Sequence, residues 1–196
     1  PTTGDLVSYG TPRRNFIVSG PQLQLWRAAL DNDGLKLEPG KPMKLLTTWQ
    51  GLGYDTIQMT LSDIEQIGAK ISFTYHGSGR GHPNDIRHTA TYTMNSNGSL
   101  HVEHYVKFGA DITDVPRVGV TMAIPLQYRD VTWLGRGPWE NYPDRKASAM
   151  ISKYNRDVDD LYVPYIMPQE NGLRCDVSDI TFDNKRGSSL SVLSDD

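Results

Sequence analysis

Residues 135–145 form the densest group of side chains that could do chemistry. Eleven positions hold carboxylates, guanidinium groups, an amide and aromatic rings. Aromatic rings stack on the C–H faces of sugars, while carboxylates and arginines bond to sugar hydroxyls. The alternative is a structural loop, in which the arginines pair with the acids and the rings cover the sheet. Under either interpretation the candidates are Trp139, Glu140, Asn141, Tyr142, Asp144 and Arg145.

A second group lies at residues 168–175 and contributes Glu170, Asn171 and Arg174. Glu140 and Glu170 could form the acid pair of a glycosidase, but spacing in sequence does not give their separation in space. We therefore assign no catalytic residue to this chain. Cys175 is expected to be a small buried apolar residue and not a nucleophile.

The third group is the segment Arg27–Gly34, where Asp31, Asn32 and Asp33 precede a glycine. An EF-hand beginning at Asp31 would need an acid at its twelfth position, which is Pro42, so that motif is excluded. Two interpretations remain: a turn in which these side chains bond their own backbone, or a turn that holds a cation. The candidates facing a substrate are Arg27, Asp31, Asn32, Asp33 and Gly34, and the stretch Asp31 to Lys36 is the favoured one.

The histidines do not predict a metal site. His101 and His104 are three positions apart on an expected strand, so they face opposite sides. Gly77–Gly81 lacks the following helix that a phosphate-binding loop requires. The remaining histidines flank this glycine-rich stretch and are predicted to lie in a solvated loop: His76, His82 and His88.

The elements that position these groups are predicted to be strands. Apolar and polar residues alternate over 71–75, 90–94, 100–108 and 118–124, as expected for half-buried strands. The segment Asn95–Gly98 predicts a hairpin turn. Leu61–Ile67 lacks an apolar helical stripe and is interpreted as strand and turn. No linker is evident, which favours a single domain over residues 1–196.

Composition narrows the class of protein. The net charge of -3 offers no basic field for nucleic acid. No apolar run reaches the roughly 20 residues that cross a bilayer. The single cysteine rules out an internal disulfide and fits a reducing compartment.

The three groups together resemble one family, the large bacterial β-galactosidases of glycoside hydrolase family 2. Residues 27–33 are similar to the family's R-A-P-x-D-N-D segment, with Ala29 where the family usually has proline. Residues 133–145 resemble W-L-G-x-G-P-x-E-N-Y-P-D-R, and residues 162–175 resemble Y-x-P-Y-x-x-P-x-E-N-G-L-R-C. The last two segments are long and specific, so they carry the resemblance.

The resemblance implies an all-β fold: a large antiparallel β-sandwich of the galactose-mutarotase-like supersandwich type. It implies the C-terminal, fifth or small-chain domain of the enzyme, truncated at both ends. The implied activity is retaining hydrolysis of terminal β-D-galactose from lactose-like substrates in the bacterial cytoplasm. The catalytic glutamates belong to a (β/α)₈ barrel outside this chain. The isolated fragment is therefore expected to be inactive and to shape the mouth of the active site.

The resemblance also implies partners and cofactors. The partners are the remaining β-galactosidase domains, especially the catalytic barrel, and the galactoside substrate. Magnesium, with sodium as a further candidate, would be bound outside this domain and no cofactor within it. Removing strands exposes sheet edges, so the fragment is expected to self-associate. The alternatives are a free-standing carbohydrate-binding module and a mutarotase-like aldose epimerase.

Overall fold

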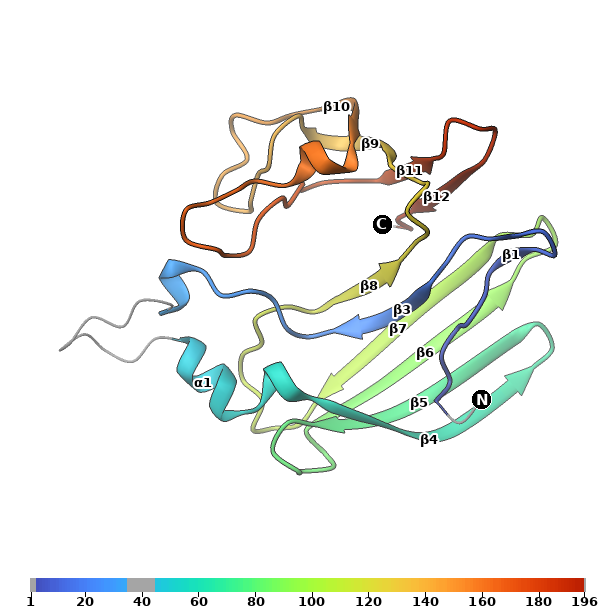
Figure 1. Cartoon of the computed structure of the whole chain (residues 1–196). Helices are drawn as coiled ribbons and strands as arrows, with labels where there is room; N and C mark the ends of the chain where they lie inside the picture. Colours follow the sequence, from blue (N-terminus) through green and yellow to red (C-terminus); the bar gives the residue numbers. More distant parts are fainter. Residues whose placement is uncertain (1–2, 35–44, 196) are drawn as a thin grey trace. The chain divides into compact units, whose positions relative to one another are not determined.

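The computed structural model describes residues 3–34 and 45–195, which gather into two compact units. Unit 1 takes the described residues within Pro1–Val7 and Ser19–Met122, and unit 2 takes those within Ser8–Val18 and Ala123–Asp196. The elements, labelled in Figure 1, are β1 (Gly10–Thr11), β2 (Arg14–Asn15), β3 (Ser19–Gln24), η1 (Asp31–Asp33), α1 (Leu45–Gly51), η2 (Tyr54–Thr56), β4 (Gln58–Ile67), β5 (Lys70–Ser78), β6 (Ile86–Met94), β7 (Leu100–Phe108), β8 (Gly119–Ala123), β9 (Asp130–Gly137), β10 (Met150–Asp157), η3 (Val158–Leu161), β11 (Asp179–Asp183) and β12 (Ser189–Leu193). The prediction of one domain over 1–196 stays a prediction.

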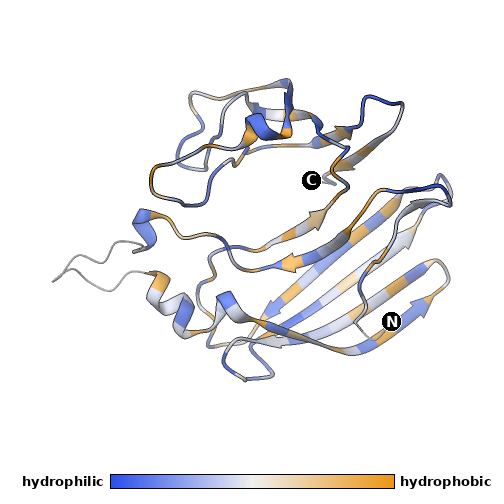
Figure 2. Cartoon of the chain, viewed as in Figure 1, coloured by the Kyte–Doolittle hydropathy of each residue, from blue (hydrophilic) through white to orange (hydrophobic). Residues whose placement is uncertain are grey.

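Unit 1 is built on an antiparallel sheet in the order β4-β5-β6-β7. Apolar and polar residues alternate along these strands (Figure 2), and the register places the apolar ones on one face, called the inner face. The outer face carries rows of small polar residues, with Ser72 Oγ 3.0 Å from Thr91 Oγ1 and Thr74 Oγ1 3.3 Å from Thr89 Oγ1. The alternation read from the sequence is thus confirmed as the division between the two faces of this sheet.

The short sheet β3-β8 lies against the inner face of the unit 1 sheet. Tyr92 Oη donates to the carbonyl of Pro21 in β3 at 3.2 Å, and Tyr75 Oη donates to the carbonyl of Thr3 at the same distance. The layers close over a buried apolar set: Leu25, Trp49, Tyr54, Ile86, Ala90 and Tyr92.

Local turn signals were read correctly. The amide of Asn95 donates to the Ser99 carbonyl at 2.9 Å, and Gly98 takes a φ of 84° in the predicted hairpin turn. Leu61–Ile67 falls within β4, which confirms strand over helix. The seven-residue helix α1 was not predicted, because only Trp49 on it is buried and no apolar stripe marks it.

The prediction of a solvated loop is wrong for His76, which lies within β5, and for His88. Strand β6 begins at Ile86, so His88 falls on the core face and is only 4% exposed. Its Nε2 lies 2.9 Å from His104 Nδ1, and the Tyr75 ring stacks on its other side at 5.5 Å between centroids. The prediction that His101 and His104 face opposite sides is confirmed, since His104 shares the inner face while His101 lies with Glu103 on the outer one.

Unit 2 contains a second antiparallel sheet in the order β10-β9-β11-β12. One face is the core face, where Val131 and Trp133 of β9 are fully buried. The unit's buried residues also include Ile17, Tyr128, Ala149 and Leu190. Long segments, 138–149 and 162–178, join these strands and carry the remaining candidate residues. The predicted all-β class of antiparallel sheets is confirmed.

Candidate functional site

The turn at Arg27–Gly34 is held by a buried ion pair. Arg27 Nη1 and Nη2 donate to the two carboxylate oxygens of Asp33 at 2.6 and 3.0 Å. Asp33 Oδ2 also accepts from the backbone N–H of Leu30 at 2.7 Å, which caps the 3₁₀ helix η1. A bidentate guanidinium–carboxylate pair fixes both partners in orientation as well as distance. Arg27 and Asp33 therefore define the shape of the turn.

Other residues of unit 1 contact this ion pair. The Arg27 guanidinium lies over the Trp49 ring at 5.3 Å from its centroid, and Trp49 Nε1 donates to Asp114 at 3.1 Å. A guanidinium on an indole face is further stabilised by the ring's negative quadrupole. The turn is thus anchored to helix α1, which the sequence did not predict.

Anchoring leaves two of the five candidates facing solvent. Asp33 and Gly34 are buried, whereas Asp31 and Asn32 are exposed. Gly34 ends η1 with a φ of 103°, a backbone conformation that side-chain-bearing residues rarely adopt. Leu35 and Lys36, the rest of the favoured stretch, lie outside the described residues.

In unit 2, Glu140 is the centre of a second network. Its side chain is 7% exposed, and both oxygens are engaged. Oε2 accepts from Tyr142 Oη at 3.1 Å and from the Gly172 amide at 2.9 Å. Oε1 accepts from Arg145 Nη2 at 3.1 Å and from Tyr165 Oη. This carboxylate joins the loop at 138–149 to the loop at 162–178.

The electrostatics of Glu140 follow from these contacts. Burial alone would raise its pKa, but hydrogen bonds from Tyr165, the Gly172 amide, Tyr142 and Arg145 together hold the pKa below its usual value. In return, burial and Glu140 raise the pKa of Tyr142 to about 12. A general acid needs a raised pKa, whereas the lowered pKa keeps Glu140 charged at neutral pH, which favours a structural role.

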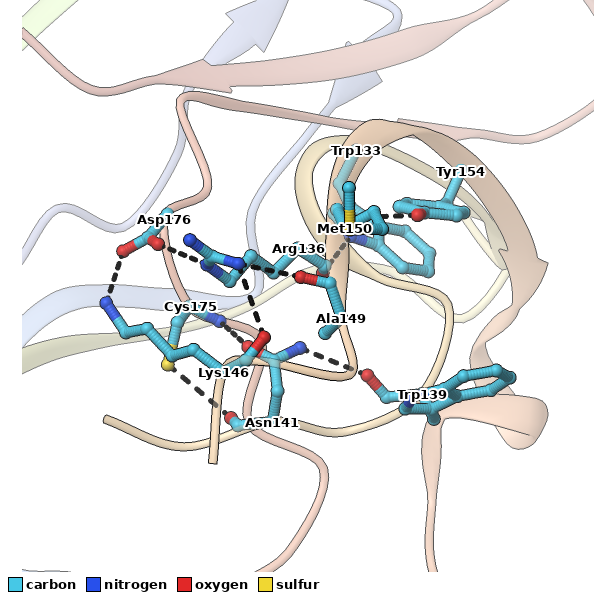
Figure 3. A network of polar contacts seen from close by, with 10 residues as sticks. All are labelled: Trp133, Arg136, Trp139, Asn141, Lys146, Ala149, Met150, Tyr154, Cys175 and Asp176. Carbon is cyan, nitrogen blue, oxygen red and sulfur yellow. Dashed lines mark hydrogen bonds and ion pairs between the residues drawn. The ribbon is translucent and has the colours of Figure 1, made fainter. Parts of the chain in front are cut away.

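Asn141 performs a similar joining role without charge. It is 0% exposed, its Nδ2 donates to the Trp139 carbonyl at 3.1 Å, and its Oδ1 accepts from the Cys175 amide at 2.8 Å (Figure 3). Cys175 Sγ lies 3.5 Å from the Asn141 carbonyl and is half-buried. This side-chain amide adds to the backbone hydrogen bond that the Asn141 N–H donates to the Leu173 carbonyl at 2.8 Å, so the two loops are joined twice at one residue.

The C-terminal candidates are also tied to backbone. Asn171 Oδ1 accepts from the Val163 amide at 3.1 Å, and Nδ2 donates to the Gln169 carbonyl at 3.2 Å. Arg174 donates to the carbonyls of Leu161 and Gly172 at 3.1 and 2.7 Å. By contrast Trp139 is 58% exposed, Asp144 is exposed and Glu170 is half-buried.

Sequence reasoning missed one further network. Arg136 Nε donates to Asp176 at 2.5 Å, Lys146 Nζ lies 2.7 Å from the same carboxylate, and Arg136 Nη1 reaches the Ala149 carbonyl at 2.8 Å (Figure 3). Asp176 directly follows the candidate segment, with a positive φ of 53° that marks a tight turn. The alternation of the β9 side chains was the available signal, because it turns Arg136 away from the core.

Residues 3–34 and 45–195 contain neither a clustered metal-ligand set nor a membrane-spanning helix. No cluster of three or more histidine, cysteine, aspartate or glutamate side chains has the arrangement of a metal site. In the same part of the chain, no helix has the length and apolar character to cross a membrane.

The two units, built on antiparallel sheets with loops held by carboxylates, are consistent with the sequence comparisons that follow. Residues 1–195 match the family model described as β-galactosidase small chain. A β-galactosidase of Psychromonas ingrahamii is 33% identical over 173 residues, covering 84% of this chain and 16% of that protein. One of Vibrio cholerae is 34% identical, covering 77% and 15%, and one of Oenococcus oeni is 31% identical, covering 94% and 18%.

The chain belongs to the β-galactosidase small-chain family, as the sequence motifs had indicated. It spans about one sixth of the length of the relatives it matches.

Proposed function

We propose that this chain forms a non-catalytic domain of a retaining β-galactosidase that removes terminal β-D-galactose from lactose-like substrates. In this role the turn at Asp31–Asn32 shapes the mouth of an active site whose glutamates and magnesium belong to the catalytic barrel. The partners are that barrel and the other domains of the enzyme, in the cytoplasm.

One observation carries the proposed role of the turn. Arg27 and Asp33 lock its backbone from the buried side, and the adjacent Asp31 and Asn32 are left exposed. Polar groups presented on a fixed backbone lose little entropy when they meet a ligand, which suits a rim that positions substrate. The engaged oxygens of Glu140 support a structural loop in unit 2.

The test is a kinetic comparison within the complete β-galactosidase that contains this chain. Asp31→Ala with Asn32→Ala is expected to raise KM for lactose about threefold to tenfold with kcat little changed, since rim contacts bind ground and transition states alike. Asp55→Ala, at an exposed position of η2, is the matched control and should leave both constants unchanged. An unaltered KM in the double variant would exclude the role at the mouth.

The isolated chain provides the second arm. It is expected to show no hydrolysis of a nitrophenyl β-D-galactoside above buffer. Turnover that disappears in Glu140→Gln or Glu170→Gln would contradict a non-catalytic domain.

A second candidate function, a carbohydrate-binding module, is favoured by a pocket of about 520 Å³ in unit 1. Tyr75, His88 and Tyr92 line it, and Asp5 and Gln22, joined by a 3.1 Å hydrogen bond, stand at its rim. Calorimetry of the isolated chain with galactose and lactose separates the candidates. Millimolar or tighter binding that Gln22→Ala abolishes would favour the module.

A further inference from the structure

Unit 2 contains a pocket that the proposed function does not use. It has a volume of about 630 Å³, within the size range of small-molecule sites. The side chains that matter for its chemistry come from β10, η3 and the two long loops: Trp139, Glu140, Arg145, Arg156, Asp160 and Arg174.

Arg174 is the most unusual group in this pocket. Its guanidinium is held by three backbone carbonyls, those of Leu161, Gly172 and Pro138, and lies over the Trp133 ring at 5.6 Å. Its Nε is buried and has no hydrogen-bond partner among the described residues. Three carbonyl dipoles hold the cation in place, and Glu140 acts on it through space by raising its pKa.

The charges around the pocket do not balance. Both oxygens of Glu140 already accept hydrogen bonds from four donors, one of which is the Arg145 guanidinium. Burial is the largest effect on the pKa of Arg174 and lowers it; Glu140 and Tyr142 oppose this, and Arg156 adds a smaller lowering. Among the described lining residues the only other acid is Asp160, which is exposed at η3. Arg156 and Arg174 thus give the pocket an excess of positive charge.

Trp139 adds an apolar surface beside these cations. Its side chain is 58% exposed, although its backbone carbonyl is tied to Asn141. Indole faces stack on the C–H faces of sugar rings, and an indole has only two side-chain torsions to fix on binding. Guanidinium groups in turn are the preferred partners of carboxylates.

We propose that this pocket binds an acidic monosaccharide, a hexuronic acid, with its carboxylate at Arg156 in the field of Arg174 and its ring against Trp139. The inference does not depend on the proposed role at the active-site mouth. It assigns to unit 2 a ligand that differs from galactose by one charged group.

The test compares two sugars that differ only at C6. Calorimetry of the whole chain with galacturonate and galactose at low salt should give a dissociation constant about tenfold smaller for galacturonate, the gain expected of one charge-assisted contact. That preference should shrink as salt is added, because exposed charges are screened. Equal constants for the two sugars, or no binding of galacturonate, would overturn the proposal.

Three variants locate the site without disturbing the anchored Arg174. Arg156→Gln should reduce the preference for galacturonate to below about threefold, whereas Asp160→Asn should strengthen galacturonate binding about threefold and leave galactose unchanged. Arg186→Gln, an equal loss of charge in the β11–β12 turn, is the control and should keep the tenfold preference. Identical behaviour of Arg156→Gln and Arg186→Gln would reduce the effect to net charge and contradict the assignment.

A third probe separates sugar recognition from simple anion binding. The inhibition constant of inorganic phosphate, measured by competition, should be at least tenfold larger than the dissociation constant of galacturonate. Trp139→Ala should raise the dissociation constant of galacturonate about fivefold. Equal affinity for phosphate, with no effect of Trp139→Ala, would show a general anion site and refute a sugar ligand. None of these outcomes affects the kinetic test of the turn at Asp31–Asn32, so the two proposals fail separately.

Discussion

Two neighbouring aspartates on one turn have opposite roles. Asp33 is 6% exposed and pairs with Arg27 through both oxygens, whereas Asp31 faces solvent two positions earlier. Asp33→Ala leaves a half-buried guanidinium unpaired and is expected to lower the free energy of unfolding by about 3 kcal/mol. Asp31→Ala should change it by less than about 0.5 kcal/mol. Urea denaturation of both variants measures the difference, and equal losses would contradict it.

Glu140 is also expected to stabilise the fold through its charge, and this contribution to the free energy of unfolding depends on pH. Glu140→Gln keeps the shape but removes the charge that its hydrogen-bond donors stabilise, and should cost about 2 kcal/mol at pH 7. Because the folded-state pKa is held low, the wild-type advantage is full above the unfolded-state pKa near 4.5 and declines as pH falls through the folded-state value. Glu65→Gln, at an exposed position on β4, is the control. A constant difference from pH 7 down to pH 2 would contradict the shift.

At the scale of elements, the pair of histidines that joins β6 and β7 should make unit 1 sensitive to acid. Burial and the neighbouring His104 lower the pKa of His88 from 6.5 to about 4. Between pH 6.5 and about pH 4, His88 is therefore protonated in the unfolded chain but neutral in the folded chain. The free energy of unfolding falls as pH falls through this range. Between pH 6.5 and pH 5 the loss should be about 2 kcal/mol.

His88→Gln provides the comparison, because glutamine does not titrate. Its unfolding free energy should be lower at pH 7 but should change less between pH 6.5 and pH 5 than that of the wild type. Chemical denaturation at the two pH values measures both slopes. Parallel slopes would mean that His88 is not the titrating group.

The strands were predictable where the determinants are local. Alternation and the Asn97–Gly98 turn depend on residues close in sequence, so β5, β6, β7 and their hairpin could be read directly. The sequence identified Glu140 and Asn141 as candidates but not their hydrogen-bond partners. The Gly172 amide that donates to Glu140, for example, lies 32 positions away in sequence. His88 was misassigned for the same reason: its burial depends on where β6 begins and on which face the second layer covers.

At the scale of the whole molecule, exposed apolar side chains predict self-association. Leu134, Ile151 and Leu193 share the outer face of the unit 2 sheet and are 41%, 58% and 70% exposed. Their position on one face, beside strands whose outer edges are unpaired among the described residues, favours pairing between copies. Sedimentation velocity should show dimers or larger species that grow with concentration.

The double variant Ile151→Lys with Leu193→Lys should shift the chain toward monomer. Val7→Lys with Val118→Lys adds the same charge at exposed apolar positions of unit 1 and should leave the association unchanged. Strictly monomeric wild-type protein would refute self-association, and equal effects of both variants would refute this face.

The two arginine–carboxylate locks close very short stretches of chain. Arg27 meets Asp33 six positions away, and Glu140 meets Arg145 five positions away. Closing so small a ring costs little loop entropy, so each turn can form before distant strands are in place. These turns are therefore modular in the engineering sense. The residues between each pair of locking side chains could be exchanged between β-galactosidases as cassettes, with exposed positions varied and the folding of the recipient preserved.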